Sequence, residues 1–197
     1  MAISAIILAG GRATRMNGID KGWALLNQRA LISHVISRLS PQVDEILINA
    51  NRELDRYAAL GYPVWSDSYP DFVGPLAGIS LGLQHAQQEY VLSVPCDCPL
   101  LPLDLAERLL AALNEHQAQI AVASCHGRSQ PVFCLCKKSV LATLQAYLQQ
   151  GNRRVSDWQK SLAYVEVDFT DRAQAFINLN TAEDLAALEL QLSLSSL

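Results

Sequence analysis

The chain of 197 residues has little of what membrane, secreted and nucleic-acid-binding proteins need. Its apolar runs fall short of the roughly 20 consecutive residues that span a bilayer, which argues against a membrane partner. Lysine and arginine number 15 against 19 acidic residues, and the net charge of −4 argues against a nucleic-acid partner. The first residues, Met1-Ala2-Ile3-Ser4, include no basic region of the kind that opens a secretory signal. We therefore expect a cytoplasmic protein.

The cysteines favour neither disulfides nor a zinc site. Their number is five, which is odd; Cys96 and Cys98 form one C-x-C pair, Cys134 and Cys136 another, and Cys125 stands alone. Structural zinc sites usually have wider spacing within each cysteine pair. In a strand, residues i and i+2 share a face, and free cysteine is among the most buried residue types. We expect reduced thiols in or beside the core.

Apolar segments alternate with amphipathic ones along most of the chain. The strands that we predict are Ala5–Leu8, Glu45–Asn49, Pro63–Trp65, Tyr90–Val94, Ile120–Ser124, Pro131–Cys136 and Tyr164–Asp168. The helices that we predict are Ala30–Leu39, Glu53–Leu60, Leu76–Gln87, Leu103–His116, Lys138–Gln150, Arg154–Lys160 and Ala182–Leu190, the last with a capping box formed by Thr181 and Asp184. This alternation predicts a three-layer, Rossmann-like α/β fold whose mostly parallel central sheet has helices on both faces. The length favours a single domain over residues 1–197.

The segment that says most about function lies near the N-terminus. The apolar run Ala5–Leu8 enters Ala9-Gly10-Gly11, and Lys21 follows ten residues after Gly11. Paired glycines let backbone N–H groups crowd around an anion without interference from a Cβ atom. Arg12 and Arg15 lie between these points and add positive charge. The segment predicts a cradle for a polyphosphate and therefore a protein that handles nucleotides.

Polar residues also follow the next predicted strands. Asn49 ends the second strand, Asp67 follows the third, and Asp97 follows the fourth inside the turn Pro95–Pro99. In open α/β sheets, ligands bind at the carboxyl ends of the strands. Prolines restrict the turn around Asp97, and a carboxylate that faces a triphosphate suits Mg²⁺. The alternative is that Asp97 only caps the helix near Leu103, but a cap needs no place in a proline-restricted turn several residues upstream.

Two segments in the middle of the chain have both a functional and a structural interpretation. Gly74–Gly78 is either a simple helix start or a loop that lets the backbone approach a base or ribose. Ser80 lies at the centre of a G-x-S-x-G motif, and Asp97 and then His116 or His126 follow in the order of a hydrolase triad. A nucleophile elbow lies between a strand and a helix, however, and Ser80 lies within a helical pattern. We regard the hydrolase as a minor alternative.

Two polar pairs in the second half have weaker signals. Arg153 and Arg154 form either an ordinary solvated turn or a contact for an anionic second substrate, because arginine binds phosphate with two donors. Asn178 and Asn180 form either a helix-entry turn or a pair of amides that point side by side into a cleft.

Taken together, these residues resemble the molybdenum cofactor guanylyltransferases. The resemblance runs across nearly the whole chain and is carried by Leu8–Gly11, Asp20-Lys21, Asn49, Asp67, Gly74–Gly78, Asp97, Gly151–Val155 and Asn178–Thr181. The first of these motifs alone indicates only the wider nucleotidyltransferase superfamily. In this family the enzyme joins the GMP part of GTP to the terminal phosphate of the molybdopterin cofactor and releases pyrophosphate.

The resemblance implies a role for each matching residue. It assigns nucleotide contacts to Leu8, Ala9, Gly10, Lys21, Asn49, Asp67 and Asp97, with Asn49 and Asp67 on the base or ribose. Asp97 would hold Mg²⁺, and Lys21 and Arg15 would stabilise the departing pyrophosphate. The candidates for binding the acceptor are Arg153, Arg154, Asn178 and Asn180. The partners would be GTP, the molybdopterin cofactor, and molybdoenzymes or accessory proteins that receive the product.

Other interpretations stay open at this point. A cytidylyl or sugar-phosphate nucleotidyltransferase would share the first motif. A non-catalytic carrier of nucleotide or cofactor would need neither a metal-positioning carboxylate at Asp97 nor the cation at Lys21. A hydrolase that uses Ser80 comes third.

Overall fold

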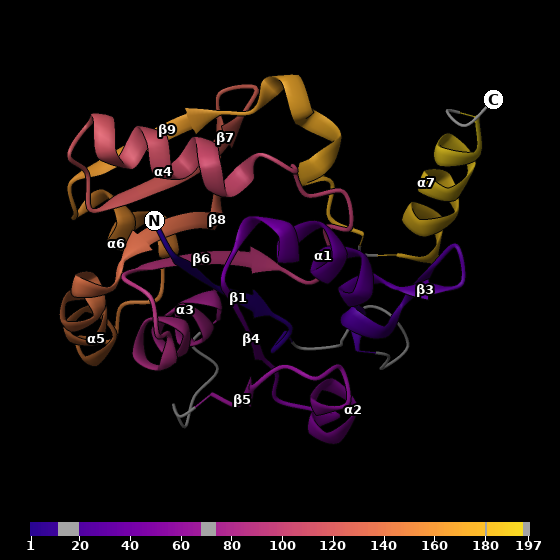
Figure 1. Ribbon diagram of the computed structural model, residues 1–197, viewed down its shortest axis with the longest axis horizontal. Coiled ribbons are helices and arrows are strands. Elements are labelled where there is room, and N and C mark those ends of the chain that lie inside the picture. The colour runs from indigo at the N-terminus through magenta and orange to yellow at the C-terminus, as the bar shows by residue number, and fades with distance from the viewer. Residues whose placement is uncertain (12–19, 68–73, 180, 195–197) are drawn as a thin grey trace.

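Seven strands form one sheet in the order β5-β4-β1-β6-β8-β7-β9 (Figure 1). The computed structural model describes residues 1–11, 20–67, 74–179 and 181–194. The strands are β1 (Ile3–Leu8), β4 (Glu45–Asn49), β5 (Val64–Trp65), β6 (Tyr90–Pro95), β7 (Ile120–Cys125), β8 (Arg128–Lys137) and β9 (Tyr164–Asp168). All pairs in this sheet are parallel except the two that β8 makes with β6 and β7. The predicted α/β fold with a mostly parallel sheet is confirmed.

Strand β1 lies in the middle of the parallel part of the sheet because its sequence is apolar on both faces. Ile6 and Ile7 point to opposite faces, and both are fully buried. The register places Leu8 opposite Asn49 of β4 on one side and Pro95 of β6 on the other. The carboxyl ends of these three strands therefore lie side by side.

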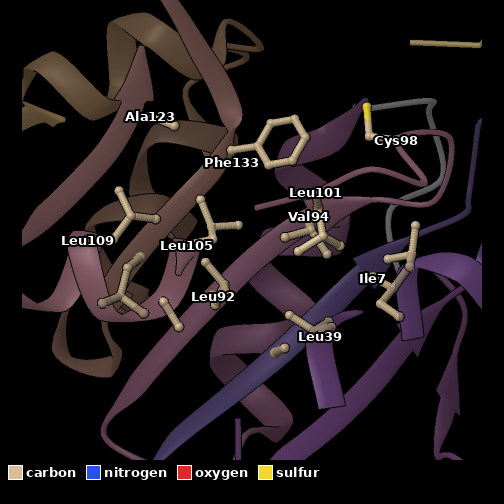
Figure 2. Packing of buried hydrophobic residues seen from close by; sticks show 14 of the residues in the cluster. Ile7, Leu39, Leu92, Val94, Cys98, Leu101, Leu105, Leu109, Ala123 and Phe133 are labelled. Carbon is tan, nitrogen blue, oxygen red and sulfur yellow. The ribbon is translucent and has the colours of Figure 1, made fainter. Parts of the chain in front are cut away.

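Helices cover both faces of the sheet and complete the three layers (Figure 1). One face is covered by α1 (Leu31–Leu39) and α4 (Leu105–Glu115), and the other by α3 (Pro75–His85), α5 (Leu141–Gln149) and α6 (Val155–Lys160). Figure 2 shows the first of these interfaces, where Leu39, Leu92, Leu105 and Leu109 belong to one buried cluster. Each buried leucine stabilises the fold by roughly 1.5–3 kcal/mol. None of the described helices is both long enough and apolar enough to cross a membrane.

A small hairpin, which the sequence pattern did not predict, supports the C-terminal helix. Strands β2 (Leu25–Leu26) and β3 (Arg29–Ala30) are joined by Asn27 and Gln28, which both have positive φ angles, 48° and 62°. Leu26 packs with Leu188 of α7 (Ala182–Leu194). Two-residue strands are too short to show a hydrophobic period, which is why they were missed.

Shorter helical elements connect these parts. They are α2 (Leu54–Ala58) and the 3₁₀ helices η1 (Lys21–Trp23), η2 (Ser40–Gln42), η3 (Lys138–Val140) and η4 (Thr170–Phe176). Helix α7 begins with the predicted capping box: Asp184 N–H donates to Thr181 Oγ1 at 3.1 Å, and Thr181 N–H donates to Asp184 Oδ2 at 2.9 Å.

The predicted burial of the five cysteines is confirmed. All are free thiols, and each is buried. Cys134 and Cys136 share one face of β8, with their sulfur atoms 3.9 Å apart. Over the parts of the chain that the structure describes, no group of three or more His, Cys, Asp or Glu residues is placed to hold a metal ion.

Candidate functional site: a cavity at the carboxyl ends of three strands

A cavity of about 380 Å³ opens where β1, β4 and β6 end. Its lining is formed by Leu8, Ala9, Gly10, Gly11, Asp20, Lys21, Asn49, Asp67, Gly74, Pro75, Pro95, Cys96, Asp97 and Val132. Two backbone hydrogen bonds extend the sheet pairing into the loops: Ala9 N–H donates to Asn49 O at 2.8 Å, and Cys96 N–H donates to Leu8 O at 3.2 Å. All seven residues predicted to contact a nucleotide line this one cavity.

The Asp67 carboxylate is held by two amide side chains. Asn49, which is buried at the end of β4, donates from Nδ2 to Asp67 Oδ1 at 2.9 Å. Asn51 donates from Nδ2 to Asp67 Oδ2 at 2.7 Å, and its Oδ1 accepts from Asp67 N–H at 2.9 Å. Asn49 and Asp67 were predicted from the sequence as site residues, whereas Asn51 was not. The available signal was the spacing Asn49-x-Asn51, which places two amides on the loop that leaves β4.

Glycines bring the surrounding backbone close to Asn49. A Cβ atom at Gly10 would lie 3.0 Å from Asn49 Oδ1 and 2.8 Å from Asn51 Nδ2. A Cβ atom at Gly78 in α3 would lie 2.5 Å from both Asn49 Oδ1 and Leu8 Cδ2. Real Cβ atoms essentially never approach to less than 3.0 Å, so a larger residue at either position would force these neighbouring side chains to move. For Gly78, the close neighbours in the structure are the Asn49 and Leu8 side chains, which neither the helix start nor the approach to a base or ribose had predicted.

A cation and a carboxylate that both line the cavity form an ion pair. Lys21 Nζ lies 3.2 Å from Asp97 Oδ2, and the two side chains are 27% and 13% exposed. Asp20 supports Lys21 from behind, because its Oδ1 accepts from Gly22 N–H at 3.1 Å and from the Tyr57 hydroxyl at 2.6 Å. These bonds cap η1, so the backbone at Lys21 is held while its side chain reaches the cavity.

Two buried cysteines, Cys96 and Cys98, flank Asp97 in its turn and leave the Asp97 carboxylate as the only charged group there. Burial raises the pKa of Cys96 and Cys98 well above the usual range, and the neighbouring Asp97 charge raises both further. Both thiols therefore stay neutral at neutral pH. The Asp97 carboxylate already pairs with a cation at the cavity, and one such hard oxygen donor fits a Mg²⁺ ion whose other ligands are phosphate and water. The donor set does not fit zinc, which prefers thiolates and imidazoles.

The acceptor-binding candidates are distributed differently. Asn178 lies next to the Asp97 turn, where its Oδ1 accepts from the Cys98 thiol at 3.0 Å, and Leu179 N–H donates to Asp97 O at 3.2 Å. Arg153 donates to Leu148 O at 2.9 Å in the α5–α6 connection, and Arg154 is exposed beside Asp157.

Neither Arg153 nor Arg154 is among the described residues that line the cavity. Arg15 and Asn180 lie outside the described residues. The acceptor roles of Arg153, Arg154, Asn178 and Asn180 stay predictions, and so does the pyrophosphate role of Arg15.

The structure places Ser80 where the sequence pattern predicted it, inside a helix. It is the sixth residue of α3, and it is buried. A nucleophile elbow would put the serine at a strand-to-helix turn with its hydroxyl exposed. The G-x-S-x-G match is therefore a coincidence of helix packing, in which Gly82 lies against Ile6.

Comparison with known proteins agrees with this geometry. Residues 5–164 match the family model of the MobA-like NTP transferase domain. A molybdenum cofactor guanylyltransferase from Shewanella sp. (strain MR-4) is 47% identical over 195 residues, which cover 99% of each chain. Another from Shewanella loihica is 49% identical over 181 residues, or 92% of each chain.

Two solved structures show the same fold at low identity. Molybdopterin-guanine dinucleotide biosynthesis protein A from Archaeoglobus fulgidus has a TM-score of 0.79 at 21% identity and covers 96% of this chain and 98% of its own. A CMP:2-keto-3-deoxy-manno-octonic acid synthetase complexed with CTP has a TM-score of 0.74 at 12% identity, covering 99% and 100%. At these identities the likeness shows the fold alone, whereas the family model matches residues 5–164 and the curated relatives match nearly the whole chain. The chain is a nucleotidyltransferase and belongs to the molybdenum cofactor guanylyltransferase family.

Proposed function

We propose that this enzyme transfers the guanylyl group of GTP to the terminal phosphate of the molybdopterin cofactor, with Mg²⁺ bound and pyrophosphate as the second product. The observation that supports this most strongly is the single cavity that gathers all seven predicted nucleotide contacts, including the facing pair Lys21 and Asp97. The names of the Shewanella relatives support guanine as the base and the molybdenum cofactor as the acceptor.

The reaction needs positioning and charge neutralisation rather than a nucleophilic side chain. An oxygen of the cofactor phosphate forms a bond to the α-phosphorus of GTP, and the bond from that phosphorus to the bridging oxygen of pyrophosphate breaks in line. The attacking phosphate is already ionised at neutral pH, so no strong general base is required. In phosphoryl and nucleotidyl transfers most of the catalysis comes from alignment and from stabilisation of the spreading negative charge.

Each side of the cavity has a separate task in this scheme. The Ala9-Gly10 backbone and the Asn49–Asp67 pair hold the nucleoside end, because they lie where β1 and β4 finish. Lys21 lines the cavity beside Asp97, and its ammonium group neutralises phosphate oxygens and the departing pyrophosphate. Asp97 would hold Mg²⁺, which when bound supplies Lewis-acid polarisation of the phosphoryl oxygens. Once phosphates enter, Lys21 exchanges its contact with Asp97 for contacts with them.

The test is pyrophosphate release, measured with GTP, CTP, ATP and UTP in turn, with and without molybdopterin cofactor as acceptor. We expect release with GTP only, and only when both the acceptor and Mg²⁺ are present. Release with CTP in place of GTP would overturn the choice of base. GTP binding without release for any nucleotide would favour a carrier.

Asp97→Ala tests the metal role within the same assay. We expect the fold to be retained and turnover nearly abolished, with Asp55→Ala on the exposed side of α2 as the matched control. Turnover of Asp97→Ala near the wild-type rate with Mg²⁺ would remove this carboxylate from the mechanism. The cytoplasmic location and delivery of the product to molybdoenzymes or accessory proteins stay predictions.

A further inference from the structure

Asn51 connects three parts of the cavity wall that come from distant parts of the chain. It lies on the loop after β4, and its Nδ2 donates both to Asp67 Oδ2 at 2.7 Å and to the backbone oxygen of Gly10 at 3.2 Å. Its Oδ1 accepts from the backbone N–H of Asp67 at 2.9 Å. The side chain thus uses its donor group and its acceptor group at once, and it joins the loops that follow β1, β4 and β5.

These contacts fix the direction in which the Asp67 carboxylate faces. Asn49 donates to Oδ1 and Asn51 to Oδ2, so each carboxylate oxygen has one amide donor. A carboxylate has about four lone-pair sites, so each oxygen retains further capacity to accept. The carboxylate lines the cavity, where that remaining capacity is available to a ligand. The matching ligand group is a pair of adjacent N–H or O–H donors, as on the edge of a guanine base or on a ribose diol.

We propose that Asn51 is a positioning residue for nucleotide recognition, which acts through Asp67 and Gly10 and does not itself touch the reacting atoms. The inference rests on the proposed function, because it takes the cavity as the nucleotide site. Asn51 orders the Asp67 carboxylate before the nucleotide binds, so that the two carboxylate oxygens are already aligned to accept hydrogen bonds from it. Loss of this side chain weakens binding of the nucleotide and leaves the chemical step at saturation largely intact.

Asparagine is suited to this position because one short side chain must donate to Asp67 Oδ2 and Gly10 O and also accept from Asp67 N–H. Alanine would remove all three hydrogen bonds. Aspartate has nearly the same shape and can still accept from Asp67 N–H, but it would place a second negative charge against Asp67 Oδ2. A residue that only fills space would tolerate the isosteric aspartate, whereas a positioning residue would not.

The test compares Asn51→Ala and Asn51→Asp with the wild type and with Asn114→Ala. Asn114 lies exposed on α4, so it gives the same chemical change away from the cavity. Steady-state kinetics give KM and kcat for the nucleotide that the wild type uses, calorimetry gives its Kd, and thermal melting checks the fold. Because the comparison uses that nucleotide, a base other than guanine would overturn the proposed function without affecting this test.

We expect Asn51→Ala to raise KM and Kd about tenfold, the effect of losing one hydrogen bond to a carboxylate, with kcat changed less than about threefold. Asn51→Asp should raise KM further than Asn51→Ala does, although it keeps the shape of the side chain. Asn114→Ala should match the wild type in all three quantities. Unchanged KM in both Asn51 variants, a fall in kcat alone, or an aspartate variant that binds as well as the wild type would overturn the proposal.

Discussion

The substitution Gly78→Ala tests whether α3 positions the Asn49 side chain at the proposed nucleotide site. Alanine in the middle of a helix is normally favoured over glycine by about 1 kcal/mol. Here the added Cβ would lie 2.5 Å from Asn49 Oδ1 and from Leu8 Cδ2, so the Asn49 side chain must move. Because Asn49 Nδ2 donates to Asp67, that movement breaks one of the two amide bonds to the carboxylate.

Gly82→Ala is the matched control, one helical turn further along α3. Its Cβ would lie 2.7 Å from Ile6 Cγ2, in the core rather than at the cavity. Overpacking costs about 1–3 kcal/mol at either site, which offsets the gain in helix propensity. Both variants should therefore lose up to about 2 kcal/mol of stability. At about 2–4 °C per kcal/mol for a chain of this size, the melting temperature should fall by up to about 8 °C.

The two variants should differ in their KM for GTP. The hydrogen bond from Asn49 to the Asp67 carboxylate is worth about 1.5–3 kcal/mol, so Gly78→Ala should raise KM for GTP at least about tenfold. Gly82→Ala should leave KM within about twofold of the wild type. The assay is steady-state kinetics well below both melting temperatures. Equal KM values for the two variants, or a stabilised Gly78→Ala with normal KM, would refute the reasoning.

Three further outcomes follow from the structure. Lys21→Ala should lower kcat/KM for GTP about a hundredfold while the melting temperature changes by less than about 4 °C; an unchanged kcat/KM would remove its phosphate role. Tyr57→Phe removes the hydroxyl that donates to buried Asp20, so urea denaturation should show a loss of about 1–3 kcal/mol, and no measurable loss would contradict the contact. Unfolded thiols ionise above about pH 8.5, whereas folded Cys96 and Cys98 keep their protons because burial raises their pKa. Stability should therefore fall as the pH rises above about 8.5, by up to about 1.4 kcal/mol per pH unit for each thiol, and a flat profile to pH 10 would be inconsistent with their burial.

Most strands of the seven-stranded sheet were predictable because they are short, largely apolar runs bounded by polar or small residues. β1 and β4 end where the sequence predicted, at Leu8 and Asn49. The antiparallel insertion of β8 between β6 and β7 was not predicted, although a local signal existed. His126 and Gly127 alone separate β7 from β8 and have φ angles of 49° and 70°, which is the geometry of a two-residue hairpin.

The cavity residues were predictable in part because parallel strands bring their carboxyl ends together. Contacts between loops were harder, since they depend on side-chain direction after the strand has ended. Lys21 and Asp97 are 76 positions apart, and their pairing follows from the folded position of η1 rather than from any local pattern. Asn51 was missed although the spacing Asn49-x-Asn51 is visible in the sequence, because its partners Gly10 and Asp67 are known only from the fold. Arg153 was selected for its charge, yet its guanidinium binds the local backbone of the α5–α6 connection.

The most direct test of guanylyl transfer follows the two ends of GTP separately. The wild-type enzyme is incubated with Mg²⁺, molybdopterin cofactor and GTP labelled either at the α-phosphate or at the γ-phosphate, and the products are separated. We expect the α-label in the acceptor, now a guanine dinucleotide, and the γ-label in pyrophosphate. Release of the γ-label as single phosphate, with no α-label in the acceptor, would contradict guanylyl transfer.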